Sequence, residues 1–201
     1  KIVDDSAKRK MNGQHDTLEQ LKKIAKSKWN PREYIGYSEQ RENQDRKTVE
    51  EIVEEYHKWD KQNLNTIVGA EIDMDIKIGK YIIDGKIDRV EKDPDGEYVI
   101  VDYKTGGKNK EITNLNESLQ LNIYAMGLKA KKKFGKLPKL ISYFYPEKEG
   151  QQIFSYEVNQ TDIDNTKRKL EEFLKSIDDG KFGADPNMKK CGWGDYKDLC
   201  D

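Results

Sequence analysis

One stretch, residues 81–106, constrains the fold of this 201-residue chain more than any other. It contains two runs of strand-like composition, Tyr81–Val90 and Glu97–Lys104, separated by a segment that includes Asp93-Pro94-Asp95-Gly96. Proline at the second turn position and glycine at the fourth are typical of a type I turn followed by a glycine bulge. The sequence therefore predicts a β-hairpin.

The turn also predicts which residues of the hairpin face each other. Pairing Asp93 with Glu97 places Asp88 opposite Asp102. Because successive side chains of a strand point to opposite faces, Asp102 and Lys104 share a face while Tyr103 points the other way. We expect the hairpin to gather two carboxylates and one ammonium group on one surface.

From these residues alone, two interpretations of the Asp-x-Lys group stay open. The first is a cross-strand salt bridge on a solvated face. The second is a site for a divalent metal, since paired carboxylates suit Mg²⁺. A lysine aimed at the same point can then hold a water molecule and offset negative charge on a phosphate.

Composition limits the class of protein. Charged residues (37%) outnumber hydrophobic ones (34%), so the core must be lean, and the net charge of −1 confines any nucleic-acid contact to local patches. No apolar run approaches membrane-spanning length, and both cysteines lie near the end of the chain. We expect an intracellular, cytoplasmic and nucleoid-associated protein without membrane contact. The chain starts at Lys1, which suggests a fragment or a processed protein.

Apolar periodicity predicts the remaining elements. Helices are expected over residues 13–28, 44–62, 115–134 and 162–177, and further strands over 66–78, 140–145 and 152–158. The last helix should turn Phe173 and Ile177 inward. We interpret residues 1–201 as a single α/β domain with an N-terminal helical part (1–62), a core (63–158) and a C-terminal helix with a cysteine-containing tail (159–201).

Two features of the region 115–139 bear on function. Gln120 and Tyr124 are four residues apart and share a helix face, and an apolar stripe of Leu119, Ile123 and Met126 leaves both free for another role. Six lysines then fall within residues 129–139. They form either a solvated helix end or a patch that contacts phosphates, for which the candidates are Lys131, Lys132 and Lys133.

The order of these motifs resembles the PD-(D/E)xK nuclease superfamily. The matching residues are Glu71, then GKIDR (85–89), DYKTG (102–106) and QLNIY (120–124). More narrowly, the chain is similar to the RecB-type nuclease domains that are fused to bacterial and archaeal DNA helicases. The resemblance implies a restriction-endonuclease-like core, in which a central mixed β-sheet with an antiparallel hairpin meander is flanked by helices.

The resemblance also implies roles for individual residues. Asp88 and Asp102 would hold Mg²⁺ or Mn²⁺, together with His15 from an N-terminal helix and the carbonyl of Tyr103. Lys104 would be the catalytic lysine. Gln120 and Tyr124 would support the site and contact the nucleic-acid strand, and Glu71 would be a second-metal or supporting group. Arg89 and Thr105, within the same motifs, are further candidates for contacts with nucleic acid.

Many such domains carry a C-terminal C-x-x-C-x₅-C run that helps to hold an iron–sulfur cluster. Here Cys191 and Cys200 take the outer positions, Gly194 replaces the middle cysteine, and the chain has no upstream cysteine. A four-iron cluster normally needs four ligands, so we expect none in this chain.

The expected function is a metal-dependent deoxyribonuclease that acts on single-stranded DNA or duplex ends within a repair or recombination helicase-nuclease. The alternative is a non-catalytic DNA-binding or scaffold module with the same fold.

Overall fold

A mixed β-sheet forms the centre of the computed structural model, which describes residues 1–105 and 113–181. Within these ranges the sheet has five strands in the order β1-β2-β3-β4-β5. The first three form an antiparallel meander, β3 and β4 are parallel, and β4 and β5 are antiparallel. The strands are β1 (Thr66–Ile78), β2 (Tyr81–Lys92), β3 (Tyr98–Tyr103), β4 (Leu140–Phe144) and β5 (Ile153–Glu157).

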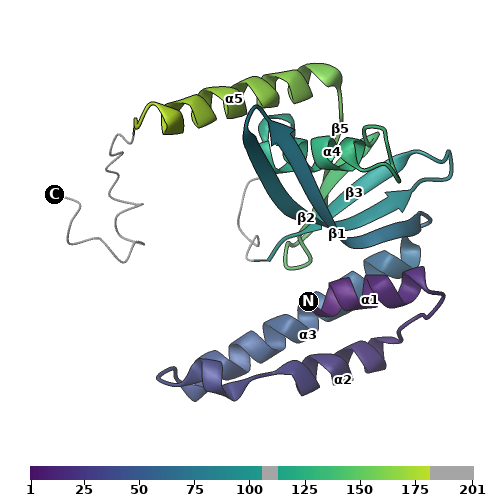
Figure 1. Ribbon diagram of the computed structural model, residues 1–201. Coiled ribbons are helices and arrows are strands. Elements are labelled where there is room, and N and C mark those ends of the chain that lie inside the picture. Colours follow the sequence, from purple (N-terminus) through teal and green to yellow (C-terminus); the bar gives the residue numbers. More distant parts are fainter. Residues whose placement is uncertain (106–112, 182–201) are drawn as a thin grey trace.

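Helices cover both faces of the sheet, as Figure 1 shows. One face carries α1 (Ile2–Met11), α2 (Leu18–Lys28) and α3 (Glu39–Gln62), and we call it the N-terminal face. The other carries α4 (Leu119–Ala130) and α5 (Gln160–Asp178). Short 3₁₀ turns occupy Pro31–Tyr34 and Leu115–Glu117. The expected architecture, a mixed sheet with flanking helices, is confirmed.

The sheet divides the hydrophobic core into two layers. Val99 and Val101 of β3 pack with Leu21 and Val53 on the N-terminal face. Ile100, between them in the sequence, belongs to the core cluster that includes α4. Alternation along β3 therefore assigns Asp102 to the α4 side, because it follows Ile100 by two residues.

The hairpin forms with the predicted register. The Asp93 N–H donates to the Glu97 carbonyl at 2.9 Å, and the Gly96 N–H donates to the Asp93 carbonyl at 2.9 Å. Gly96 has φ +82°, which glycine adopts without steric cost. Arg89 pairs with Val101, so the next residues out along the strands are Asp88 and Asp102.

Several helix predictions need correction. The helix α1 was not expected, because its few apolar residues make only a weak stripe. The helix expected from residue 13 begins at Leu18, where Thr17 and Gln20 form a capping box, so His15 precedes it. The helix expected over 115–134 is shorter, since Ser118 caps its start and it ends at Ala130.

The C-terminal helix also differs from expectation. Phe173 and Ile177 are 63% and 37% exposed rather than inward. The helix extends past the sheet (Figure 1), so its buried residues, Ile163, Thr166 and Leu170, all lie in its first part.

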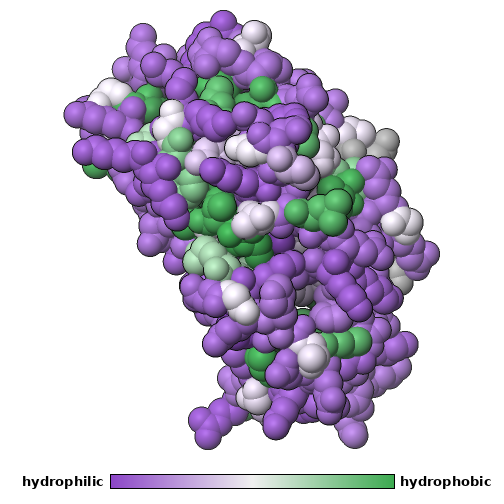
Figure 2. Space-filling view, turned by 90° about the vertical axis from the view of Figure 1, so that its right-hand side faces the viewer, coloured by the Kyte–Doolittle hydropathy of each residue, from purple (hydrophilic) through white to green (hydrophobic). Residues whose placement is uncertain are grey.

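The surface seen in Figure 2 is mostly hydrophilic, with apolar residues in small scattered groups. Among the helices of the described ranges, none has the length and apolar character needed to cross a membrane.

Candidate active site on the α4 side of the sheet

Two strands place two carboxylates side by side. Asp102 of β3 is 2% exposed, and Asp88 of β2 is partly buried. The backbone N–H of Tyr103 donates to Asp88 Oδ2 at 3.0 Å, which links the two strands at this point. The hairpin thus brings together the carboxylates that its register predicted.

Lys104 follows β3 and completes the group. Its Nζ lies 2.7 Å from Asp102 Oδ2 and donates to Gln120 Oε1 at 2.7 Å. The ammonium also lies over the ring of Tyr143, 4.9 Å from the centroid. A carboxylate, an amide oxygen and an aromatic face therefore fix the position of the lysine.

Gln120 is itself oriented by hydroxyl groups. Its Nε2 donates to the Tyr124 hydroxyl at 2.9 Å, and the Tyr143 hydroxyl donates to its Oε1 at 3.4 Å. Ser118 Oγ lies 2.9 Å from the Tyr143 hydroxyl. These contacts turn the amide oxygen toward Lys104.

The apolar stripe of α4 differs from the predicted one. The residues that α4 buries include Leu121, Tyr124, Ala125 and Leu128, whereas Leu119 is exposed. Tyr124 is thus a core residue whose hydroxyl reaches the site, where it hydrogen-bonds with Gln120 and contributes to the electrostatics of Asp102.

Burial is the main influence on the acidity of both carboxyl groups. It raises the pKa of Asp88 to about 6, with further contributions from Asp102 and Asp4, against the opposing Tyr103 N–H and Lys104. Burial also raises the pKa of Asp102, while Lys104 opposes the shift. Negative charge at this point is poorly solvated, so a cation here would be stabilising.

The donor set fits a hard divalent cation. Although Asp102 Oδ2 is buried and close to Lys104, it accepts no hydrogen bond of normal geometry from the described residues. Those residues contain no group of three or more His, Cys, Asp or Glu side chains that could hold a metal ion. Two carboxylates would leave several positions for water or phosphate oxygens, as Mg²⁺ prefers.

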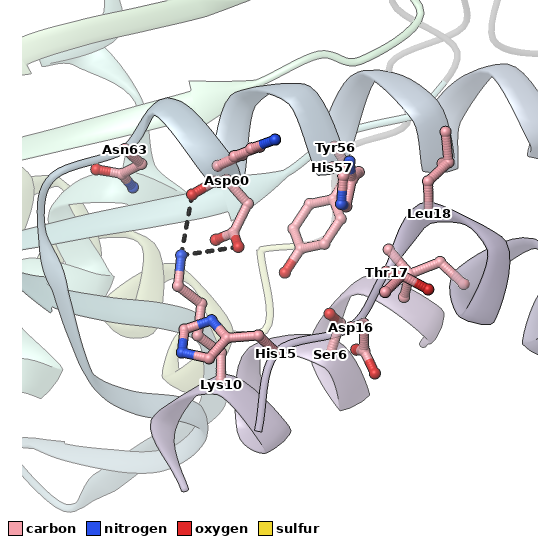
Figure 3. A pocket seen from close by; sticks show the side chains of 12 residues that line it. Ser6, Lys10, His15, Asp16, Thr17, Leu18, Tyr56, His57, Asp60 and Asn63 are labelled. Carbon is pink, nitrogen blue, oxygen red and sulfur yellow. Dashed lines mark hydrogen bonds and ion pairs between the residues drawn. The ribbon is translucent and has the colours of Figure 1, made fainter. Parts of the chain in front are cut away.

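His15 is not brought to these carboxylates. It lies in the linker between α1 and α2 and lines a pocket that it shares with Tyr56 and Asp60 (Figure 3). Neither Asp88 nor Asp102 lines that pocket. The structure therefore does not assemble the ligand set of His15, Asp88 and Asp102, because His15 faces the end of α3 across this pocket.

Glu71 is held by cationic side chains of the N-terminal segment. It lies in the middle of β1 with φ +49°. Its carboxylate binds the ammonium groups of Lys1 and Lys8, which lower its pKa to about 2. Glu71 thus anchors the α1 segment to the sheet.

Arg89 is not available to nucleic acid. It is fully buried on the N-terminal face, where Nε donates to Glu91 at 2.5 Å and Nη1 donates to Asp60 at 2.7 Å. Its guanidinium also lies over the ring of Trp59. The prediction that Arg89 contacts DNA is therefore wrong. Alternation along β2 points its side chain to the face opposite that of Asp88.

The other predicted residues are spread around the site and beyond. Thr105 is exposed beside Lys104, and only the backbone of Tyr103 faces the carboxylates, since its ring packs on the N-terminal face.

The three lysines proposed as phosphate contacts lie after α4. Lys131 pairs with Asp75 at 3.2 Å, Lys133 donates to the Val68 carbonyl at 3.0 Å, and Lys132 is exposed. Cys191, Gly194 and Cys200 lie outside the described residues.

Sequence reasoning missed three residues near the site: Asp4, Ser118 and Tyr143. Tyr143 stands beside Asp102 in the β3–β4 register, a position that is readable only once the parallel pairing is known. Ser118 precedes the first helical residue of α4, a typical capping position that could have been recognised. Asp4 contributes to the raised pKa of both carboxyl groups from α1, a helix that the pattern did not reveal.

A mixed sheet that presents an Asp…Asp-x-Lys group beneath a Gln-x-x-x-Tyr helix defines a nuclease-type core. The chain belongs to the PD-(D/E)XK nuclease superfamily, whose family model matches residues 1–201. The search of curated proteins gives no match. Among solved structures 25 chains match. One is the crystal structure of SSO0001, with 18% identity, a TM-score of 0.41, and coverage of 66% of this chain and 59% of that one.

Proposed function

We propose that this domain is a metal-dependent deoxyribonuclease that hydrolyses phosphodiester bonds. The observation that carries the proposal is the position of Lys104, whose ammonium contacts both Asp102 and Gln120 at 2.7 Å beside the second carboxylate, Asp88. A surface salt bridge would not need a glutamine that is itself held by Tyr124 and Tyr143. Family membership supports the same reaction class.

The roles of the residues follow from their contacts. Lys104 can donate hydrogen bonds to an attacking water or to a phosphate oxygen and can offset the negative charge that develops in phosphoryl transfer. Gln120 keeps the ammonium pointed toward Asp102. Asp88 and Asp102 would hold Mg²⁺ or Mn²⁺, which when bound supplies Lewis-acid chemistry at the phosphate.

The substrate proposal is DNA that is recognised through its backbone, as single strands or duplex ends. We further propose that this chain is a RecB-type domain that acts beside a helicase in repair or recombination. The order of the sequence motifs supports this part of the proposal. A helicase partner has no support in the fold.

The test is cleavage of labelled single-stranded and duplex DNA in Mg²⁺, Mn²⁺ or EDTA. Lys104→Ala removes a positive charge that stabilises the transition state, and Asp102→Asn removes a carboxylate that would hold the metal, so each should lower the cleavage rate by about 100-fold or more. Lys77→Ala, which changes an exposed lysine of β1, is the matched control and should cut normally.

Cleavage by Lys104→Ala at the wild-type rate would contradict the proposal. DNA binding without cleavage in any metal would favour the scaffold alternative. Circular dichroism of each variant separates loss of activity from loss of fold.

A further inference from the structure

A second candidate site lies on the N-terminal face of the sheet, away from Asp102 and Lys104. It is a pocket of about 570 Å³ between α1, the linker before α2 and the end of α3 (Figure 3). Both histidines of the chain, His15 and His57, line it. Its size is within the range of small-molecule sites.

The pocket floor presents a hydrogen-bonding group without a partner. Tyr56 is 1% exposed, yet its hydroxyl forms no hydrogen bond with the described residues, although the hydroxyls of Ser6 and Tyr103 lie near it. Figure 3 shows this hydroxyl directed into the pocket. Buried polar groups are rarely left unpaired, so the Tyr56 hydroxyl points to a ligand atom that the pocket receives.

A second unpaired donor lies behind the same wall. Nη2 of Arg89 is buried and has no hydrogen-bond partner among the described residues. Its neighbouring Nη1 binds Asp60, and Asp60 lines the pocket. The unsatisfied groups at this wall can thus both donate, which favours a ligand rich in acceptor oxygens.

The charges in the pocket favour an anion. Its two acidic residues already have cationic partners: Asp16 binds Arg9 at 2.8 Å, and Asp60 binds both Lys10 and Arg89. Lys61, at the rim, has no ion-pair partner in the described part of the chain. Of the ionisable groups that line the pocket, one ammonium, two imidazoles and a phenol are left to act on a ligand.

We propose that this pocket binds the phosphate group of a nucleotide. Lys61 and the histidines surround the phosphate, the Tyr56 hydroxyl donates to it from the floor, and Leu18 and Leu21 give the base or sugar an apolar wall. Metal binding is not the better interpretation, because the described residues hold no suitable cluster of ligands there. The inference does not depend on cleavage at Asp102 and Lys104.

The experiment uses the full chain in EDTA, with the two histidine side chains as NMR reporters. The probes are inorganic phosphate, deoxyadenosine monophosphate and deoxyadenosine. We expect both histidine signals to shift saturably with the monophosphate, more weakly with inorganic phosphate, and not with deoxyadenosine. Lys61→Ala and Tyr56→Phe should each weaken the monophosphate affinity several-fold, and Lys58→Ala, an exposed lysine of α3 outside the pocket, should not.

Absence of a saturable shift below about 10 mM monophosphate would overturn the proposal. Equal affinity in wild type, Lys61→Ala and Tyr56→Phe would also overturn it, provided that circular dichroism shows the variants folded. Equal binding of inorganic phosphate and the monophosphate would overturn the nucleotide assignment. A response to deoxyadenosine alone would overturn the role of the phosphate.

Discussion

Arg89 and Asp88 are neighbours in the sequence but belong to opposite faces of the sheet. Asp88 faces the site, whereas Arg89 is enclosed among Glu91, Asp60 and the ring of Trp59. A guanidinium buried in this way balances two carboxylates, one of them, Glu91, almost fully buried. Its role is therefore structural.

Arg89→Ala should lower the free energy of unfolding by about 3–5 kcal/mol, because it leaves the buried carboxylate of Glu91 without a charged partner. Urea denaturation measures this loss. Lys86→Ala, on the same strand, removes only an exposed pair with Asp73 and should change stability by less than about 1 kcal/mol. If Arg89→Ala kept its normal stability but bound DNA more weakly, Arg89 would instead be a DNA contact, as the sequence predicted.

The raised pKa of Asp88 predicts a pH dependence of stability without metal. Burial raises that pKa from 3.8 to about 6, so between these values the folded state holds more protons than the unfolded state. The free energy of unfolding should therefore fall as pH rises from about 4 to 6, by less than about 3 kcal/mol for this group alone, since solvent screens a partly exposed carboxylate. Urea denaturation in EDTA across this range measures the slope.

Asp88→Asn removes the titrating group and should flatten that part of the slope. Asp84→Asn, an exposed position four residues earlier on β2, serves as the control and should keep the wild-type slope. Identical slopes for wild type and Asp88→Asn would contradict the assignment of the raised pKa to Asp88.

At the scale of elements, α4 and β1 approach closely at Gly127. A Cβ at this position would lie 2.1 Å from the sulfur of Met74. The close contact sets the height of α4 above the sheet, and hence the distance from Gln120 to Lys104.

Gly127→Ala should therefore destabilise the protein by about 1–3 kcal/mol through overpacking, although alanine is the better helix former by about 1 kcal/mol. Cleavage should also weaken as Gln120 moves away. Thermal unfolding measures the first effect. In a chain that already carries Met74→Ala, Gly127→Ala should destabilise less, because the side chain that the new Cβ would meet is gone. A more stable Gly127→Ala would show that Met74 simply moves aside.

Elements whose geometry is local could be predicted from the sequence, and those placed by tertiary contacts could not. The type of the Asp93–Gly96 turn fixes which residues of β2 and β3 pair. The prediction that Asp88 lies opposite Asp102 therefore needed only local sequence. His15 and Glu71 were matched to a family pattern by order alone, but their surroundings depend on how α1 docks. The roles of α1 and of Tyr143 emerge only from the packing of distant segments.

At the scale of the whole molecule, a cation at Asp88 and Asp102 should link metal binding to folding. Bound metal stabilises the folded state in proportion to the logarithm of its concentration, by about 2.7 kcal/mol at 100 times Kd. We expect Mg²⁺ or Mn²⁺ to raise the Tm of the wild type at pH 7 and to have little effect on Asp102→Asn. NaCl at equal ionic strength controls for screening.

An equal rise in Tm for wild type and Asp102→Asn would place the cation elsewhere. A rise that disappears in the variant would support the two-carboxylate site without any measurement of cleavage.

The turn at Gly96 has a consequence for how this chain can change in length. Successive side chains of β2 and β3 point to opposite faces of the sheet. An extra residue in either strand therefore moves every later side chain of that strand to the other face. An odd insertion between the turn and Asp102 would present Val101 or Tyr103 to α4 and send Asp102 into the opposite apolar layer. The site can therefore tolerate a change in hairpin length only if the strand gains or loses an even number of residues, or if the change stays within the loop.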